Sequence, residues 1–493
     1  GSGFTNDATG ANDMSLADTE SIEYESDKYS NKLVSFTGRI AYTLKDRYNF
    51  TATGRYDGSS RFGDNNKWGF FPSAGFSWSA SQENFMHSLK GKVTNLKLRV
   101  SYGITGNQEI GNYKSLALMS SSYYIYSDTP ILGFSESIGN PDLQWERTAQ
   151  LDLGVDISLF DRVDVTFDYY KRRTTDLLYD VPIPTTSGYS SMLENIGEVQ
   201  NHGFELNVHA RIIDRKDWKW DITGNLSKNE NEISELYGDV TEINIGTSNN
   251  GLAKLLKVGD PVTAVYGRES GGIITTEEQL TQARVYNSSA NYGEELYINH
   301  DDDPTSISSD DFICIGSTVP EFYYGLSTSV EYKNFKLEIY GQGAHHYASM
   351  TGMENNNYGD YGIGYSSSTG GLSGFYIFGE NQIHDRIYTP TQYAYKRMWR
   401  EGVNENGSFP RPGARGVYAS DRTNGDWNFF ILKNIKLSYK FDQSLVKWAK
   451  NISVYMNLQN FANSANHRGY NPENGDDSYP WAKTIIWGVN AKF

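Results

Sequence analysis

Nine consecutive residues of the chain read Leu151-Asp152-Leu153-Gly154-Val155-Asp156-Ile157-Ser158-Leu159. Every second residue is apolar, and the residues between them are polar or glycine. Because successive side chains of a β-strand point to opposite faces, this pattern predicts a strand with one apolar and one polar face. The same period recurs at 34–44, 96–104, 204–212 and 485–493, with Ile486 as an exception. The chain is therefore expected to be all-β.

The alternation alone leaves two architectures open. The apolar face could pack into the core of a β-sandwich, or it could contact lipid on the outside of a β-barrel.

The lengths of the connections favour the barrel. Short turns are predicted at 45–46, 161–162, 214–217, 333–334 and 442–450. Long polar connections are predicted at 57–67, 105–144, 171–202, 227–319, 341–426 and 462–480. A transmembrane antiparallel up-and-down barrel with short periplasmic turns and long extracellular loops produces this alternation, and about fourteen strands are expected.

Composition excludes several classes of protein. The 493 residues include 36 Tyr, 23 Phe and 10 Trp, which suits β structure. The net charge of -16 argues against a nucleic-acid partner, because phosphates require a basic surface. No apolar run approaches the length of about 18 residues that a membrane-spanning helix needs.

Several tryptophans lie near predicted strand ends, where amphipathic rings favour the membrane interface. They are Trp78, Trp145, Trp218, Trp220, Trp427, Trp481 and Trp487. An interfacial girdle is predicted from them, and ordinary core or hairpin tryptophans are the alternative.

Sequence blocks in a fixed order resemble the SusC/RagA family of TonB-dependent outer-membrane transporters. The blocks are Arg55–Gly63, Gly69–Ser73, Gly75–Trp78, Leu98–Gln108, Gly139–Glu146, Asn195–Glu205, Leu432–Tyr439 and Asn457–Phe461. The terminal Phe493 also resembles the aromatic residue by which outer-membrane assembly machinery recognises barrels.

The resemblance implies a fold and a place in the cell. Family members are barrels of about 22 strands with an N-terminal plug inside. Residues 29–493 are expected to be the C-terminal part of such a barrel, and residues 1–28 a loop at the start of a fragment. The plug, the TonB box and the signal peptide are expected to be absent from this chain. The implied location is the outer membrane, among lipid and lipopolysaccharide.

The resemblance also implies a function and partners. It implies active import of an oligosaccharide, or alternatively an oligopeptide, with a SusD-like surface lipoprotein as the lid. TonB, acting through the missing N-terminal region, and the proton-motive force would supply the energy, so no cofactor is expected. A passive outer-membrane pore and a secreted β-sandwich that binds glycans or acts as an adhesin are the alternatives.

Patterns that carry covalent chemistry are missing from the sequence. No G-x-S-x-G, H-E-x-x-H or Walker A pattern occurs, so an enzyme is not expected.

Aromatic residues in the loops are the candidate ligand contacts, because flat rings suit sugars and extended peptides. One group is Tyr123, Tyr124 and Tyr126, and the other is Tyr358, Tyr361, Tyr365, Phe375 and Tyr376. Packing within the loops, or contact with a lid protein, is the competing interpretation.

An acidic segment, His300–Pro304, resembles a degraded calcium loop of the family. Asp301 and Asp303 are its weak candidate ligands, but the glycine that such a loop uses for its sharp turn is absent. A solvated acidic loop without metal is the favoured interpretation.

Overall fold

The computed structural model describes residues 28–118, 124–126, 129–131, 138–247, 252–348, 399, 401–402, 405–407, 420–425, 427–442, 451–465, 473 and 481–492. Within these ranges, no helix combines the length and apolarity needed to cross a membrane. The domain boundary predicted after residue 28 lies at the start of the described part and stays a prediction.

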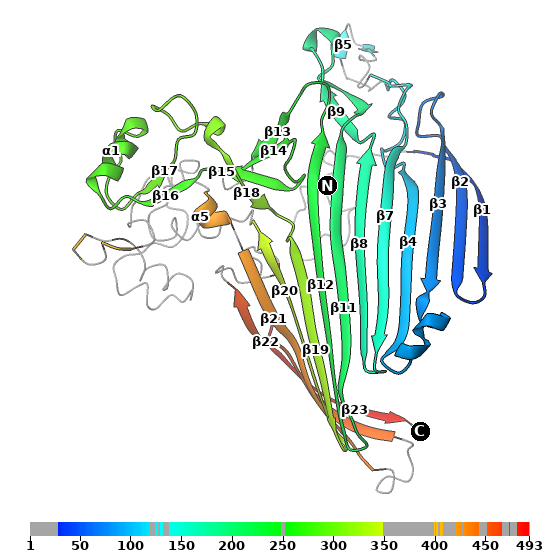
Figure 1. The fold of residues 1–493 in the computed structure, drawn as a ribbon. Coiled ribbons are helices and arrows are strands. Elements are labelled where there is room, and N and C mark those ends of the chain that lie inside the picture. Colours follow the sequence, from blue (N-terminus) through cyan, green and yellow to red (C-terminus); the bar gives the residue numbers. More distant parts are fainter. Residues whose placement is uncertain are drawn as a thin grey trace, which may run out of the picture.

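Thirteen strands form one antiparallel sheet, and each member pairs with the next member along the chain (Figure 1). They are β1 (Leu33–Leu44), β2 (Tyr48–Ser59), β3 (Trp68–Ser79), β4 (Val93–Asn107), β7 (Glu146–Leu159), β8 (Val163–Thr175), β11 (Glu198–Asp214), β12 (Trp218–Glu235), β19 (Phe322–Tyr332), β20 (Phe335–Tyr347), β21 (Trp427–Lys440), β22 (Asn451–Ala465) and β23 (Thr484–Lys492). This is the predicted up-and-down order. Because β1 and β23 stand at the two edges of the sheet, the described strands form part of a barrel wall.

Short and long connections alternate, as predicted. The pairs β1–β2, β7–β8, β11–β12 and β19–β20 are joined by tight turns at one end of the sheet, and the long loops lie at the other end (Figure 1). In outer-membrane barrels the short turns are periplasmic. The last strand, β23, therefore runs toward the periplasmic side.

Two of the tight turns have the backbone geometry that fits a twisted hairpin. In the β1–β2 turn Lys45 and Asp46 have φ of 54° and 55°, and Arg47 N donates to Leu44 O. In the β7–β8 turn Phe160 and Asp161 have φ of 55° and 53°. Positive φ at both central positions defines the type I′ turn, whose twist matches that of the flanking strands.

Replacing Asp46 with glycine is expected to stabilise the folded barrel by about 0.5–1 kcal/mol. A side chain strains a left-handed backbone, and glycine removes that strain at a smaller entropic cost. Urea unfolding of the protein in detergent would measure the gain. The substitution Ser77→Gly within β3 is the control, because there glycine should destabilise by a similar amount. A lower unfolding midpoint for Asp46→Gly would contradict the prediction.

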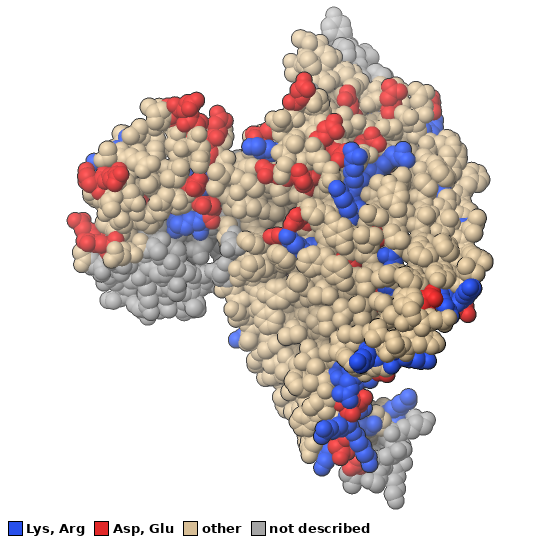
Figure 2. Space-filling view, in the orientation of Figure 1, with Lys and Arg blue, Asp and Glu red and all other residues tan. Residues whose placement is uncertain are grey.

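The two faces of the sheet differ as the alternation predicted. Large apolar side chains on one face are exposed, among them Leu98, Val100, Tyr102, Leu153, Phe167, Leu326 and Leu437. Figure 2 shows few charged side chains across the middle of the molecule and more toward the two ends of the strands. An exposed apolar belt of this kind suits contact with the hydrocarbon core of a membrane.

Several strands extend into the loops that the sequence predicts, and β8 and β12 are two of them. Loops are expected from residues 171 and 227, but β8 continues to Thr175 and β12 to Glu235. The extension of β12 includes Lys228-Asn229-Glu230-Asn231-Glu232, which is polar on both faces. A strand that leaves the membrane contacts water on both sides, so it loses the period-of-two signal.

The predicted tryptophan girdle is correct only in part. Trp218 and Trp487 are 40% and 74% exposed, as interfacial rings should be. Trp145 and Trp427 are buried, at 5% and 4% exposed, so the girdle assignment is wrong for these two. Each packs among loop and strand-end aromatics instead, because the strands extend beyond the membrane there.

The long loops contain smaller elements. They are β5 (Tyr124–Tyr126), β6 (Thr129–Ile131), β9 (Leu178–Pro182), β10 (Ser191–Asn195), β13 (Glu242–Thr247), β14 (Ala253–Lys257), β15 (Ala264–Gly267), β16 (Ser270–Ile273), α1 (Glu277–Tyr286), β17 (Glu295–Tyr297), β18 (Ile313–Ser317) and α5 (Asp421–Asn424). Short 3-10 turns lie at Ala80–Gln82, Asn84–Leu89, Thr185–Ser187 and Ser309–Asp311.

The connection between β12 and β19 builds an outer lobe, residues 268–312, which projects to the side of the sheet (Figure 1). Its helix α1 starts at a capping box, in which the Thr276 side chain accepts from Gln279 N and the Gln279 side chain accepts from Thr276 N. Leu280 and Ala283 pack into a small core with Ile274, Ala290 and Leu296. The lobe therefore has its own apolar core.

Candidate functional site

The inner face of the sheet is lined by paired charges. Arg99 Nε donates to Asp156 Oδ2 at 2.9 Å, and Arg99 Nη1 lies 2.8 Å from Asp168 Oδ1. These residues come from β4, β7 and β8, so one guanidinium ties three neighbouring strands together. A polar, hydrogen-bonded inner face of this kind suits the wet or plugged interior of a barrel.

Toward the long-loop end, the inner face carries a group of amide side chains, the asparagine ladder, formed by Asn201, Asn229 and Asn231. Asn231 Nδ2 donates to Asn201 Oδ1 at 2.9 Å, and Asn229 Nδ2 donates to the same oxygen at 3.4 Å. The ladder is held from both sides. The Tyr170 hydroxyl donates to Asn229 Oδ1, and Val262 N donates to Asn231 Oδ1.

Gly203 makes room for this arrangement. A Cβ on Gly203 would lie 2.7 Å from the Tyr170 hydroxyl and 2.1 Å from the carbonyl oxygen of Lys228. The tyrosine can therefore cross the strand and reach the ladder only because residue 203 has no side chain. Gly203 belongs to the Asn195–Glu205 block of the sequence. The contact between Tyr170 and Asn229 explains why that block has a glycine at this position.

A cavity of about 620 Å³ adjoins the ladder and is called the ladder cavity. All three ladder asparagines line it, together with Thr263, Ser317 and Tyr347. Amide groups offer both donors and acceptors, which suits ligands rich in hydroxyl or carbonyl groups. The cavity is therefore the candidate substrate contact among the described residues.

An apolar cluster, called the loop anchor, packs loops together at the long-loop end of the sheet. It consists of Phe62, Phe71, Ile110, Leu143 and Trp145, all buried. The Trp145 ring lies 4.9 Å from that of Phe62 and 5.3 Å from that of Phe71, and its Nε1 donates to Lys67 O. Several residues of the cluster belong to the blocks that carry the family resemblance. The blocks Arg55–Gly63, Gly69–Ser73 and Gly139–Glu146 supply these residues, and none of these three blocks lines the ladder cavity.

A buried ionic group, the lobe lock, fixes the outer lobe to the loop between β20 and β21. Arg422 donates to both carboxylate oxygens of Glu295, at 2.9 and 2.6 Å, and Ser420 Oγ donates to the same carboxylate. Nearby, Asp421 Oδ1 accepts from Ser270 N at 2.9 Å. Burial raises the pKa of the Asp421 carboxyl above its usual range.

The predicted aromatic contacts stay predictions. Tyr124 and Tyr126 belong to the short strand β5, but their side chains lie outside the described residues. Other predicted contacts lie wholly outside that part of the chain, as does the proposed assembly signal. These are Tyr123, Tyr358, Tyr361, Tyr365, Phe375, Tyr376 and Phe493.

The acidic segment of the outer lobe is held by its own hydrogen bonds. Asp303 Oδ1 accepts from the hydroxyl and backbone N–H of Thr305, which holds the pKa of its carboxyl below the usual range. Asp301 Oδ1 accepts from Asp303 N. No group of three or more His, Cys, Asp or Glu side chains in the described ranges is arranged to hold a metal. The weak calcium assignment therefore stays a prediction without support from the geometry.

Sequence reasoning misses the asparagine ladder and the loop anchor. The ladder brings residue 201 next to 229 and 231, and this proximity depends on the register of β11 against β12. The available signal is the dense run of asparagine and glutamate at 228–232. Such a run is typical of a polar loop, so it does not reveal a strand.

The strands form one antiparallel wall with an apolar belt outside, paired charges inside and long loops at one end. Together these features define an outer-membrane β-barrel protein. The family model for the β-barrel of TonB-dependent receptor-like proteins matches residues 1–461. The chain belongs to this family. The SusC/RagA resemblance, the outer-membrane location and the all-β barrel fold are thereby confirmed, and the β-sandwich alternative is wrong.

Relatives support the same assignment. The chain is 31% identical to TonB-dependent receptor P3 of Formosa agariphila over 98% of its own length and 48% of that protein. It is 30% identical to TonB-dependent receptor SusC of Bacteroides thetaiotaomicron over 94% of its own length and 44% of that protein. The chain thus spans about half the length of the curated relatives it matches. Both relatives are TonB-dependent receptors by name, which agrees with the prediction that the chain is not an enzyme.

Among solved structures, the fold resembles that of the RagAB peptide transporter. The TM-score is 0.74 at 25% sequence identity, and the match covers 94% of this chain and 48% of the other. A structure of the RagAB peptide importer in its open-open state matches equally well, with a TM-score of 0.74.

Proposed function

We propose that this chain forms wall and external loops of a transporter that actively imports a nutrient oligomer across the outer membrane. The ladder cavity carries the proposal, because it places amide donors and acceptors at the long-loop end of the barrel interior. Family membership supports active transport and favours it over the passive pore.

An oligosaccharide or an oligopeptide is the proposed substrate class. Sugar hydroxyls and peptide carbonyls both match the hydrogen-bonding groups of the asparagine ladder. The similarity to the RagAB peptide transporter supports an oligopeptide, and the family resemblance supports an oligosaccharide. A binding panel of oligosaccharides against oligopeptides on the purified complex would separate them.

The proposed partners are a SusD-like surface lipoprotein as the lid, TonB as the source of energy, and a plug within the barrel. Lipopolysaccharide is the proposed neighbour of the external loops. The family resemblance supports these assignments. Affinity purification of the protein from outer membranes would test the lid, since a lipoprotein should be recovered with it in a fixed ratio.

Replacing Asn201 with leucine is expected to weaken uptake of the substrate about tenfold in apparent affinity, the equivalent of losing about one or two hydrogen bonds. The side chain keeps a similar size but loses its amide. Initial uptake rates in whole cells would be measured over a range of substrate concentrations. The control is Asn207→Leu, on the same strand and face but away from the ladder cavity.

Two results would count against the proposal. Equal uptake by the Asn201 and Asn207 variants would remove the ladder from the substrate path. Uptake that continues in the presence of a proton ionophore would favour the passive pore.

A further inference from the structure

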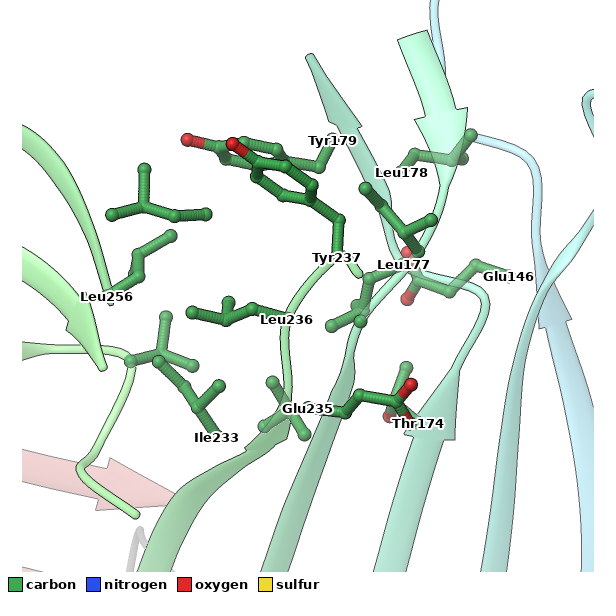
Figure 3. A pocket seen from close by; sticks show the side chains of 15 residues that line it. Glu146, Thr174, Leu177, Leu178, Tyr179, Ile233, Glu235, Leu236, Tyr237 and Leu256 are labelled. Carbon is green, nitrogen blue, oxygen red and sulfur yellow. The ribbon is translucent and has the colours of Figure 1, made fainter. Parts of the chain in front are cut away.

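A second cavity, of about 360 Å³, lies on the inner face at the long-loop ends of β7, β8, β11 and β12. It is called the apolar cavity. Val199 of β11 is among its lining residues. Ile233 lines it from β12, while Leu177, Leu236 and Leu256 approach from the loops (Figure 3). It shares Val262 with the ladder cavity, so the two are neighbours.

The walls of the apolar cavity suit a hydrophobic group. Leucine, isoleucine and valine side chains make up most of its lining, and two aromatic rings, Tyr179 and Tyr237, stand together at one side (Figure 3). Sugars, which carry a hydroxyl on most carbons, would leave those groups without partners against such walls. An aliphatic or aromatic group would gain from burial there.

One charged group faces this apolar space. Glu146 is the first residue of β7, and Figure 3 shows its carboxyl end directed into the cavity beside Leu177 and Leu178. Its carboxylate accepts a hydrogen bond from the Asn107 side chain. Among the described residues it forms no salt bridge, and none of the residues that line the cavity is Lys, Arg or His. A second carboxylate, Glu235, lies at the same cavity.

Because no cation lies beside the Glu146 carboxylate among the described residues, a ligand that carries a positive charge would be favoured here. Burying an ionised carboxylate is costly unless a cation compensates it. The rings of Tyr179 and Tyr237 would also attract a cation, because a cation is stabilised over the face of an aromatic ring. The cavity thus combines room for an apolar body with two independent features that select a cationic end.

We propose that the apolar cavity is a binding subsite for a hydrophobic group that carries an ammonium, with Glu146 as its counter-ion. The inference rests on the proposed import function and adds to it the chemistry of one part of the ligand. The amino-terminal end of an apolar peptide has this chemistry, and a neutral oligosaccharide does not.

Calorimetric binding of 2-phenylethylamine to the purified outer-membrane complex in detergent would test the subsite. 2-Phenylethanol serves as the uncharged probe of similar shape. The amine should bind at least tenfold more tightly than the alcohol. The substitution Glu146→Gln should remove that preference and leave binding of the alcohol within about twofold.

Two further variants keep the test decisive. Glu205→Gln removes a carboxylate from β11 outside the cavity and should leave both probes unaffected. Val262→Trp places a large ring at the cavity, where residue 262 is 39% exposed, and should abolish binding of both probes. Equal affinity of amine and alcohol for the unmodified protein, or unchanged amine binding by Glu146→Gln or Val262→Trp, would overturn the proposal.

The probe experiment is independent of transport. If import is driven by TonB but does not involve this cavity, the amine will not bind. Uptake will nevertheless continue. Conversely, selective amine binding without energised uptake would support the subsite and count against the import function.

Discussion

Replacing Gly63 with alanine is expected to destabilise the folded barrel by about 3 kcal/mol or more. A Cβ on residue 63 would lie 1.6 Å from the carbonyl oxygen of Pro141. That oxygen belongs to the backbone, so no change of side-chain rotamer relieves the overlap. One of the two loops must move, and both contribute to the loop anchor through Phe62 and Leu143.

Urea unfolding in detergent would measure the loss, with Gly38→Ala as the matched control. Gly38 lies in β1, and a Cβ added there would have no atom within 4 Å apart from those of residue 38 and its two chain neighbours. The control should therefore not destabilise the protein, and removing a glycine from within a strand should raise its stability by about 0.5–1 kcal/mol. If the Gly63 and Gly38 variants unfold at the same urea concentration, the contact with Pro141 does not hold these loops together.

Replacing Arg422 with alanine is expected to destabilise the outer lobe by about 3–5 kcal/mol. The Glu295 side chain is 1% exposed, so it would keep a buried negative charge after its cation is removed. The hydroxyls of Ser420 and Tyr297 would remain as donors, but neutral hydroxyls do not neutralise a carboxylate. The lobe has its own core, so the effect should appear there first.

Hydrogen exchange and limited proteolysis would locate the change. Backbone amides of α1 should exchange faster in Arg422→Ala, while those of β7 and β8 should keep their protection. Adding Glu295→Gln should restore much of the loss, because it removes the uncompensated charge. Lys257→Ala breaks an ion pair whose two side chains are 50% and 45% exposed, and is the control with an effect below about 1 kcal/mol. Unaltered exchange in α1 would contradict the prediction.

The fold can be predicted from the sequence because its main signals are local. The period of two marks each membrane strand, and the alternation of short and long connections sets the direction of each strand. Both signals can be read from the sequence before it is known which strands pair. They fail where a strand passes into water, which is why the polar end of β12 resembles a loop and why Trp145 is wrongly predicted to lie at the membrane interface.

The candidate site cannot be predicted in the same way, because it depends on contacts between distant residues. Asn201 meets Asn229 and Asn231 through strand register, and Glu146 meets Leu177 and Leu256 only after two loops have folded over the strand ends. A single sequence carries no measure of those distances. The aromatic loop residues are predicted from composition alone, and their role stays a prediction.

The lobe lock constrains how this protein can evolve. The outer lobe enters and leaves the barrel through β12 and β19, which are neighbours in the sheet, so an insertion of any length could be accommodated there. Glu295 and Arg422, however, come from different loops, and each is harmful without the other. The two loops must therefore diversify together, and swapping one of them between relatives should succeed only when the other is transferred with it.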